Sequence, residues 1–163
     1  MSIDVQEAIK RSIQTEKNAM NFYQSGADQM KDPEARRVFE ILAREEREHA
    51  GHFYRIYRGG DIPSLEAFLD LPADNESSWM SSLNALSGDD FNEKKALELA
   101  MDKELSLEKA LLESASKMGE GEVREVYELN ARETRNHYLM IESEYARLMT
   151  MVHETDMNIF VRE

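Results

Sequence analysis

The chain repeats itself at an interval of 88 residues, and this repeat constrains the possible folds more than any other feature. Residues 38–49 read VFEILAREEREH and residues 126–137 read VYELNARETRNH, with seven of the twelve positions identical. The same offset holds upstream and downstream without a gap, which indicates two copies of one structural unit. We therefore expect a single domain, residues 1–163, made of repeat halves 8–57 and 96–145, a crossover 58–95 and a C-terminal tail 146–163.

Each copy has the pattern of two helices, because its apolar residues recur at alternating steps of three and four positions. The stripe of the first helix is Ile9, Ile13, Glu16, Met20, Tyr23, Ala27 and Met30. The connection inside each copy is short, which predicts two antiparallel hairpins, whereas the connection between the copies is long. We expect an all-α, ferritin-like four-helix bundle with a long crossover between helices 2 and 3. Short helices are expected at 64–71 and 76–86 within that crossover, with Trp79 covering an apolar edge.

The amino-acid composition excludes several kinds of site and argues against several kinds of binding partner. The sequence has no cysteine, which excludes a disulfide framework, a thiol nucleophile and an iron–sulfur centre in these residues. A formal net charge of -13 argues against binding to nucleic acid or to an anionic membrane surface. No apolar run approaches the roughly 20 residues that span a bilayer, and the N-terminus lacks the pattern of a signal peptide. We expect a cytoplasmic protein that binds neither nucleic acid nor membrane.

Several ionisable residues lie within the apolar stripes, where charged side chains are rare. These residues are Glu16, Glu46, His49, Glu104, Glu108, His137 and Glu144. A buried, unpaired carboxylate costs several kcal/mol, and several of them facing one core would also repel each other. Because the stripes contain no lysine or arginine, a divalent metal ion is the simplest positive partner.

The spacing of these residues indicates a particular kind of metal site. Glu46-Arg47-Glu48-His49 is a Glu-x-x-His motif, which places Glu46 and His49 one turn apart on one helix face. Glu16 and Glu104 occupy matching positions in the first and third helices, and His137 is the counterpart of His49. In this order of residues the chain resembles the rubrerythrin branch of the ferritin-like di-iron carboxylate superfamily, without a rubredoxin domain.

The resemblance implies the ligands and the cofactor. The metal ligands that it implies are Glu16, Glu46, His49, Glu104 and His137. Tyr23, seven residues after Glu16, is implied to hydrogen-bond a ligand carboxylate. The cofactor implied is iron, two ions in the family, although carboxylate and imidazole donors also suit manganese and zinc.

One position departs from the family pattern. Thr134, three residues before His137, stands where the family carries a second bridging glutamate, so we expect it beside the metals without ligating them. Two divalent ions carry four positive charges, and the three implied glutamates leave one of these charges unbalanced. Glu108, one turn beyond Glu104, and Glu133, next to Thr134, are further candidate ligands.

The resemblance implies an oxidoreductase that reduces peroxide or oxidises ferrous iron, with a separate protein as electron donor. We expect a homodimer, and the apolar tail residues 158–161 are expected to dock on the bundle or on a second subunit. Thr134 favours an alternative: a degenerate ferritin-like bundle that binds one structural metal without turnover. A purely structural bundle, in which the inward Glu and His residues satisfy each other, is a third possibility.

Overall fold

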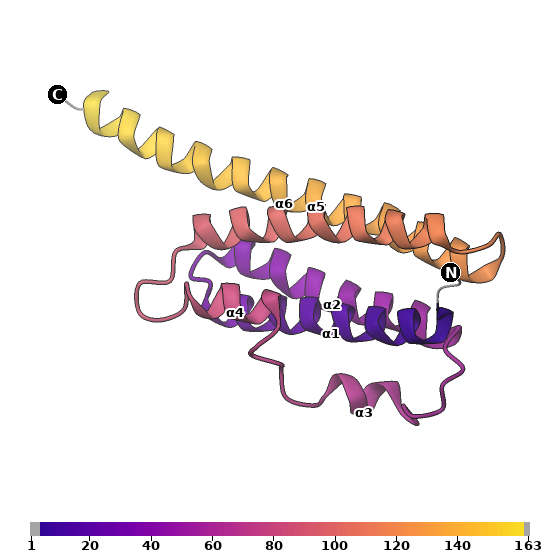
Figure 1. Cartoon of the computed structure of the whole chain (residues 1–163). Helices are drawn as coiled ribbons and strands as arrows, with labels where there is room; N and C mark the ends of the chain where they lie inside the picture. Colours follow the sequence, from indigo (N-terminus) through magenta and orange to yellow (C-terminus); the bar gives the residue numbers. More distant parts are fainter. Residues whose placement is uncertain (1–3, 162–163) are drawn as a thin grey trace.

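The computed structural model describes residues 4–161, and the side chains of residues 4–151. This part of the chain is all-helical, which confirms the predicted fold class. The helices are α1 (Val5–Gln29), α2 (Pro33–Arg55), α3 (Leu65–Leu69), α4 (Ser78–Asn84), α5 (Glu93–Lys117) and α6 (Glu122–Val161). Figure 1 shows two long hairpins, α1 with α2 and α5 with α6, packed into a bundle, with α3 and α4 in the crossover between them.

The long helices begin at side chains that accept the free amide protons of the first turn. Asp4 accepts from the amide of Glu7 at 3.1 Å, and Asp32 accepts from the amide of Ala35 at 2.9 Å. Asn92 does the same for α5, accepting from the amide of Lys95 at 3.0 Å. Each such cap stabilises a helix by about 1 kcal/mol. These caps therefore fix where each stripe begins and which residues of it reach the centre of the bundle.

Helix α4 of the crossover packs against α1 and α5 and covers one end of the groove between them. Trp79 of α4 lies with its ring centre 5.2 Å from that of Phe22, and Phe22 lies at 5.0 Å from Tyr23 in an edge-on contact. Phe39 completes this aromatic cluster at 5.0 Å from Tyr23. Lys17 of α1 is buried, but its amine donates to the backbone carbonyl of Leu71 in the crossover and is directed away from the core. The predicted covering role of Trp79 agrees with this packing.

The last helix, α6, has 40 residues and continues beyond the rest of the bundle, as the yellow segment of Figure 1 shows. Arg147 fastens it to the start of α2: its guanidinium pairs with Asp32 and lies 2.9 Å from the carboxylate of Glu34. The expectation that the apolar residues 158–161 dock on a surface concerns side chains outside the described part. No helix within the described residues is long and apolar enough to cross a membrane.

Candidate metal centre

Two histidines from the two repeats meet at the centre of the bundle around one carboxylate oxygen. Oε1 of Glu46 lies 3.2 Å from Nδ1 of His49 and 2.9 Å from Nδ1 of His137. The two imidazole rings stack with their centres 4.8 Å apart and their planes 8° from parallel. All three side chains have at most 1% of their surface exposed. One ligand atom from each can therefore face a common point, and the three atoms lie within 4.8 Å of one another.

A buried glutamate from each of the other two helices flanks this group. Glu16 of α1 places Oε2 3.7 Å from Nδ1 of His49, and Glu104 of α5 places Oε1 3.5 Å from Nδ1 of His137. Both glutamates are fully buried. The structure thus brings together all five residues that the resemblance implies as ligands, with one glutamate and one histidine from each repeat on either side of Glu46.

Two further glutamates support the histidines from outside, and they are repeat counterparts of each other. Nε2 of His137 and Oε1 of Glu45 form a hydrogen bond of 3.1 Å. Oε2 of Glu133 lies 2.6 Å from Nε2 of His49, out of line for a good hydrogen bond, so this contact is best regarded as an ion pair. Glu133, a candidate ligand from the sequence, is therefore placed on the far nitrogen of a histidine. Carboxylates in this position fix the orientation of metal-binding imidazoles.

Electrostatics in the protein without metal reflect this crowding of acids around two imidazoles. Burial alone would lower the pKa of His49 and of His137, but the surrounding carboxylates outweigh it and raise these pKa values to about 11 and about 12. Burial and the charge of Glu46 raise the pKa of Glu16 to about 8. The pKa of Glu46 itself is lowered, since its contacts with both imidazolium rings outweigh burial. The surrounding carboxylates thus favour the protonated form of both imidazoles when no metal is bound.

Several buried polar atoms in the described part of the chain have no hydrogen-bond partner. Both carboxylate oxygens of Glu16, Oε2 of Glu104 and Oγ1 of Thr134 are among them. A buried polar group without a partner costs about 1–3 kcal/mol, so a cluster of them at one point indicates a missing ligand. The donors are carboxylates and imidazoles, a set that suits iron, manganese and zinc. The residues present therefore fit a divalent metal site.

The remaining candidates lie around this centre. Tyr23 donates its phenolic proton to Oε1 of Glu104 over 2.6 Å, which is the contact that the resemblance implied. Thr134 is fully buried at the position of the expected bridging glutamate. Glu108 is directed elsewhere: both of its oxygens accept from the guanidinium of Arg135, at 2.9 and 2.7 Å, so it lies outside the group of converging ligands.

The role of Glu45 is not evident from the sequence. A signal was present, because Glu45 and Glu133 are identical at the 88-residue offset, but it did not show which nitrogen each carboxylate would face. Each glutamate contacts the histidine of the other repeat, so the pairing depends on how α2 packs against α6.

Comparison with known protein families agrees with this geometry. The family model described as Rubrerythrin matches residues 7–145, which include both repeats and the crossover. The chain belongs to the rubrerythrin family. No curated protein and no solved structure matched the chain. Rubrerythrin-family membership and the buried Glu46–His49–His137 group together support a metal-binding ferritin-like bundle.

Proposed function

We propose that this rubrerythrin-family protein is a non-haem di-iron oxidoreductase that reduces peroxide or oxidises ferrous iron, with a separate protein as electron donor. The observation that carries the proposal is the position of Glu46. One of its oxygens lies within 3.2 Å of Nδ1 of both His49 and His137, which is where a carboxylate shared by two metal ions would stand.

The ligand set divides into two halves around Glu46. Glu16 and His49 would hold one iron, and Glu104 and His137 would hold the other. When bound, iron supplies the one-electron redox steps that these side chains cannot perform themselves. The fully buried positions of Glu16, Glu46 and Glu104 keep bulk water away from the centre.

The surrounding residues orient these ligands. Glu45 and Glu133 each hold the Nε2 side of one imidazole, so that Nδ1 of each ring is directed towards the centre. Tyr23 donates to Glu104 and leaves the other oxygen of that carboxylate free to bind. Orientation fixed in advance lowers the entropy cost of assembling the site.

A second candidate function is a one-metal structural site without turnover, and Thr134 favours it. Its hydroxyl lies in the core where a fourth carboxylate would complete the charge balance of two divalent ions. The compact three-residue group Glu46, His49 and His137 is sufficient for one ion. The two candidates differ in metal stoichiometry, two ions per chain against one.

The test measures iron content and peroxide consumption in the wild type, in Glu46→Ala and in Glu48→Ala. Glu48 lies on the exposed side of the same helix and serves as the matched control. We expect two irons per chain and peroxide consumption with a reduced chemical donor in the wild type and in Glu48→Ala, and loss of both in Glu46→Ala. Equal iron retention in the two variants would contradict the site, and one inert metal per chain would favour the second candidate.

A further inference from the structure

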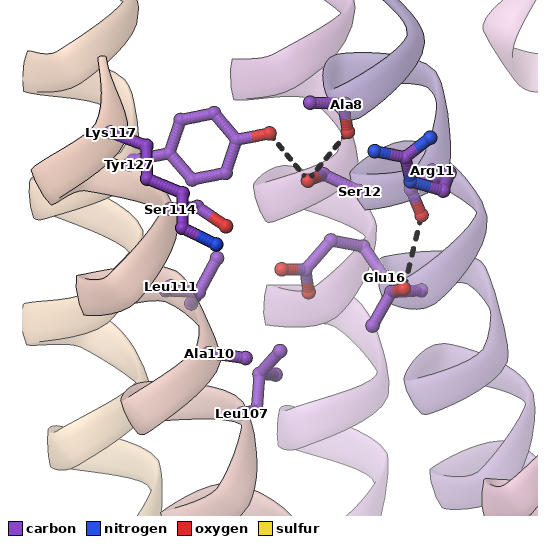
Figure 2. A pocket seen from close by; sticks show the side chains of 11 residues that line it. Ala8, Arg11, Ser12, Glu16, Leu107, Ala110, Leu111, Ser114, Lys117 and Tyr127 are labelled. Carbon is purple, nitrogen blue, oxygen red and sulfur yellow. Dashed lines mark hydrogen bonds between the residues drawn. The ribbon is translucent and has the colours of Figure 1, made fainter. Parts of the chain in front are cut away.

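A pocket of about 240 Å³ opens between α1 and α5 and ends at Glu16. Figure 2 shows the carboxylate of Glu16 extending from α1 towards Leu111 on α5, with the hydroxyls of Ser12 and Tyr127 at one side of the space. Glu16 has only 1% of its side chain exposed, so it forms the inner end of the pocket. This pocket lies between the first part of α1 and the last part of α5, away from the cluster around Trp79.

The repeat explains why the pocket exists. At the 88-residue offset, Tyr23 corresponds to Leu111, and Phe22 corresponds to Ala110. Two large aromatic side chains that fill one end of the α1–α5 groove are therefore replaced at the other end by smaller aliphatic ones. Because the interior of a protein is otherwise densely packed, this loss of volume leaves a space beside Glu16.

The same substitution leaves a hydrogen bond unmade. Tyr23 donates to Oε1 of Glu104 over 2.6 Å, and the repeat counterpart of Glu104 is Glu16. Leu111 has no hydroxyl, and both oxygens of Glu16 lack a hydrogen-bond partner. A carboxylate has two oxygens, so Glu16 could bind a metal through one of them and still accept a hydrogen bond through the other.

We propose that this pocket binds a small organic molecule with one hydroxyl or hydroperoxyl group, the class of the organic hydroperoxides and their alcohols. The hydroxyl end donates to Glu16 as Tyr23 donates to Glu104, and the hydrocarbon part lies against Leu107 and Leu111. A cavity of about 150 Å³ is sufficient to hold benzene, so a pocket of about 240 Å³ admits a phenyl-sized group with a short polar end.

The inference rests on the proposed function and names a substrate class for the same site. In the reaction, ROOH takes up two electrons and two protons, the O–O bond breaks, and the products are ROH and water. Two equivalents of the one-electron donor protein supply the electrons, and water supplies the protons. Hydrogen peroxide has no hydrocarbon part to contact Leu107 and Leu111, so the pocket favours an organic hydroperoxide.

The test uses cumyl alcohol as a binding probe and compares cumene hydroperoxide with hydrogen peroxide as substrates. Binding is followed by NMR amide shifts in the wild type, in Leu111→Tyr, which copies the first repeat, and in Leu112→Tyr. Leu112 is half-exposed on the same helix and lies outside the pocket, so it is the matched control. Ala110→Phe narrows the pocket from an exposed position and serves if Leu111→Tyr does not fold.

We expect saturable binding of cumyl alcohol in the wild type and in Leu112→Tyr, with shifts at Ser12 and Leu111. In Leu111→Tyr we expect binding at least about tenfold weaker, and a fall of similar size in the ratio of kcat/KM for cumene hydroperoxide to that for hydrogen peroxide.

Each other outcome overturns a different claim. If hydrogen peroxide is reduced but cumyl alcohol does not bind, or binds equally to Leu111→Tyr, the pocket proposal is wrong and the proposed function stands. If cumyl alcohol binds but neither peroxide is reduced, the peroxidase proposal and the hydroperoxide assignment are both wrong.

Discussion

Metal binding to this centre should release protons, because protonated side chains occupy it in the protein without metal. His49 and His137, with pKa values raised to about 11 and about 12, are protonated on both ring nitrogens at pH 7, so Nδ1 of each ring carries a proton. A metal requires the neutral imidazole, so a site built on both rings releases about two protons on binding. Glu16, with its pKa raised to about 8, adds about one more if it becomes a ligand.

The assay is anaerobic titration of the metal-free protein with Zn(II) or Fe(II) in weakly buffered solution containing a pH indicator. Since protons compete with the metal, the apparent association constant should rise with pH around neutrality, by about a hundredfold per unit when two protons are displaced. The release of protons in itself distinguishes the buried centre from exposed acidic groups, whose carboxylates are already ionised at pH 7.

Two histidines one turn apart on α2 provide the matched variants. His49→Ala should bind metal more weakly and release about one proton fewer. His52→Ala should behave like the wild type, because the ring of His52 lies 5.9 Å from that of His49 and contacts Asn130 at 3.3 Å. Metal binding without proton release, or an equal decrease in the two variants, would refute the assignment of the imidazoles as ligands.

Three further predictions concern stability. Removing the metal should lower the melting temperature by about 5–10 °C in calorimetry, since a ligand at about a hundred times its Kd stabilises by about 2.7 kcal/mol; an unchanged melting temperature would contradict binding to the folded state. In urea unfolding, Gly26→Ala should lower the free energy of unfolding by about 1–3 kcal/mol, because a Cβ there would lie 2.7 Å from the Phe39 ring. Gly51→Ala, with no atom within 4 Å of its Cβ, should raise the free energy of unfolding by about 0.5–1 kcal/mol. Equal effects of the two substitutions would contradict the packing around Gly26. Partial burial favours the neutral form of Asp32, but a backbone amide and the guanidinium of Arg147 outweigh it and hold the pKa of Asp32 below its ordinary 3.8. The ionised Asp32 therefore stabilises the fold above about pH 3.8, and this stabilisation is lost as the pH falls through the lower pKa of the folded state. Arg147→Ala should therefore cost about 1 kcal/mol near neutral pH and progressively less below about pH 4, and a cost independent of pH would rule out the Asp32 pair as its source.

The fold could be predicted from the sequence because the pattern of one helical hairpin occurs twice, at an interval of 88 residues. Stripes at helical spacing, short connections within each copy and a long one between them leave few arrangements other than a bundle of two hairpins. The five inward residues implied as ligands followed from the same stripes, since Glu16, Glu46 and His49 recur at the apolar spacing. Local pattern therefore determined which residues face the centre.

Side-chain contacts between helices are harder to predict from the sequence than the helices themselves. Glu108 shares a stripe with Glu104, but the long side chain of Arg135 on the neighbouring helix draws its carboxylate aside. Glu133 is a candidate ligand from its position in the sequence, but its contact with His49 depends on the packing of α6 against α2. Spacing along one helix gives the direction of a side chain, whereas its partner is decided by the rotamers of both helices.

The pocket beside Glu16 also depends on packing that the sequence alone does not determine. The exchange of Tyr23 for Leu111 at the repeat offset is visible in the sequence. Whether neighbouring side chains collapse into the lost volume depends on how far the surrounding helices can relax. In the structure they do not fill it, and the oxygens of Glu16 remain without a hydrogen-bond partner.

Anomalous diffraction from crystals grown with Fe(II) would show whether Glu46 is shared between metals held by His49 and His137, as we propose. We expect two anomalous peaks, one on either side of Glu46, each bound by Nδ1 of one histidine, with Glu16 on one and Glu104 on the other. A single peak ligated by all three of Glu46, His49 and His137 would support the one-metal alternative. The absence of any peak at this centre, or ligation through Nε2 in place of Nδ1, would show that Glu46, His49 and His137 do not form the proposed site.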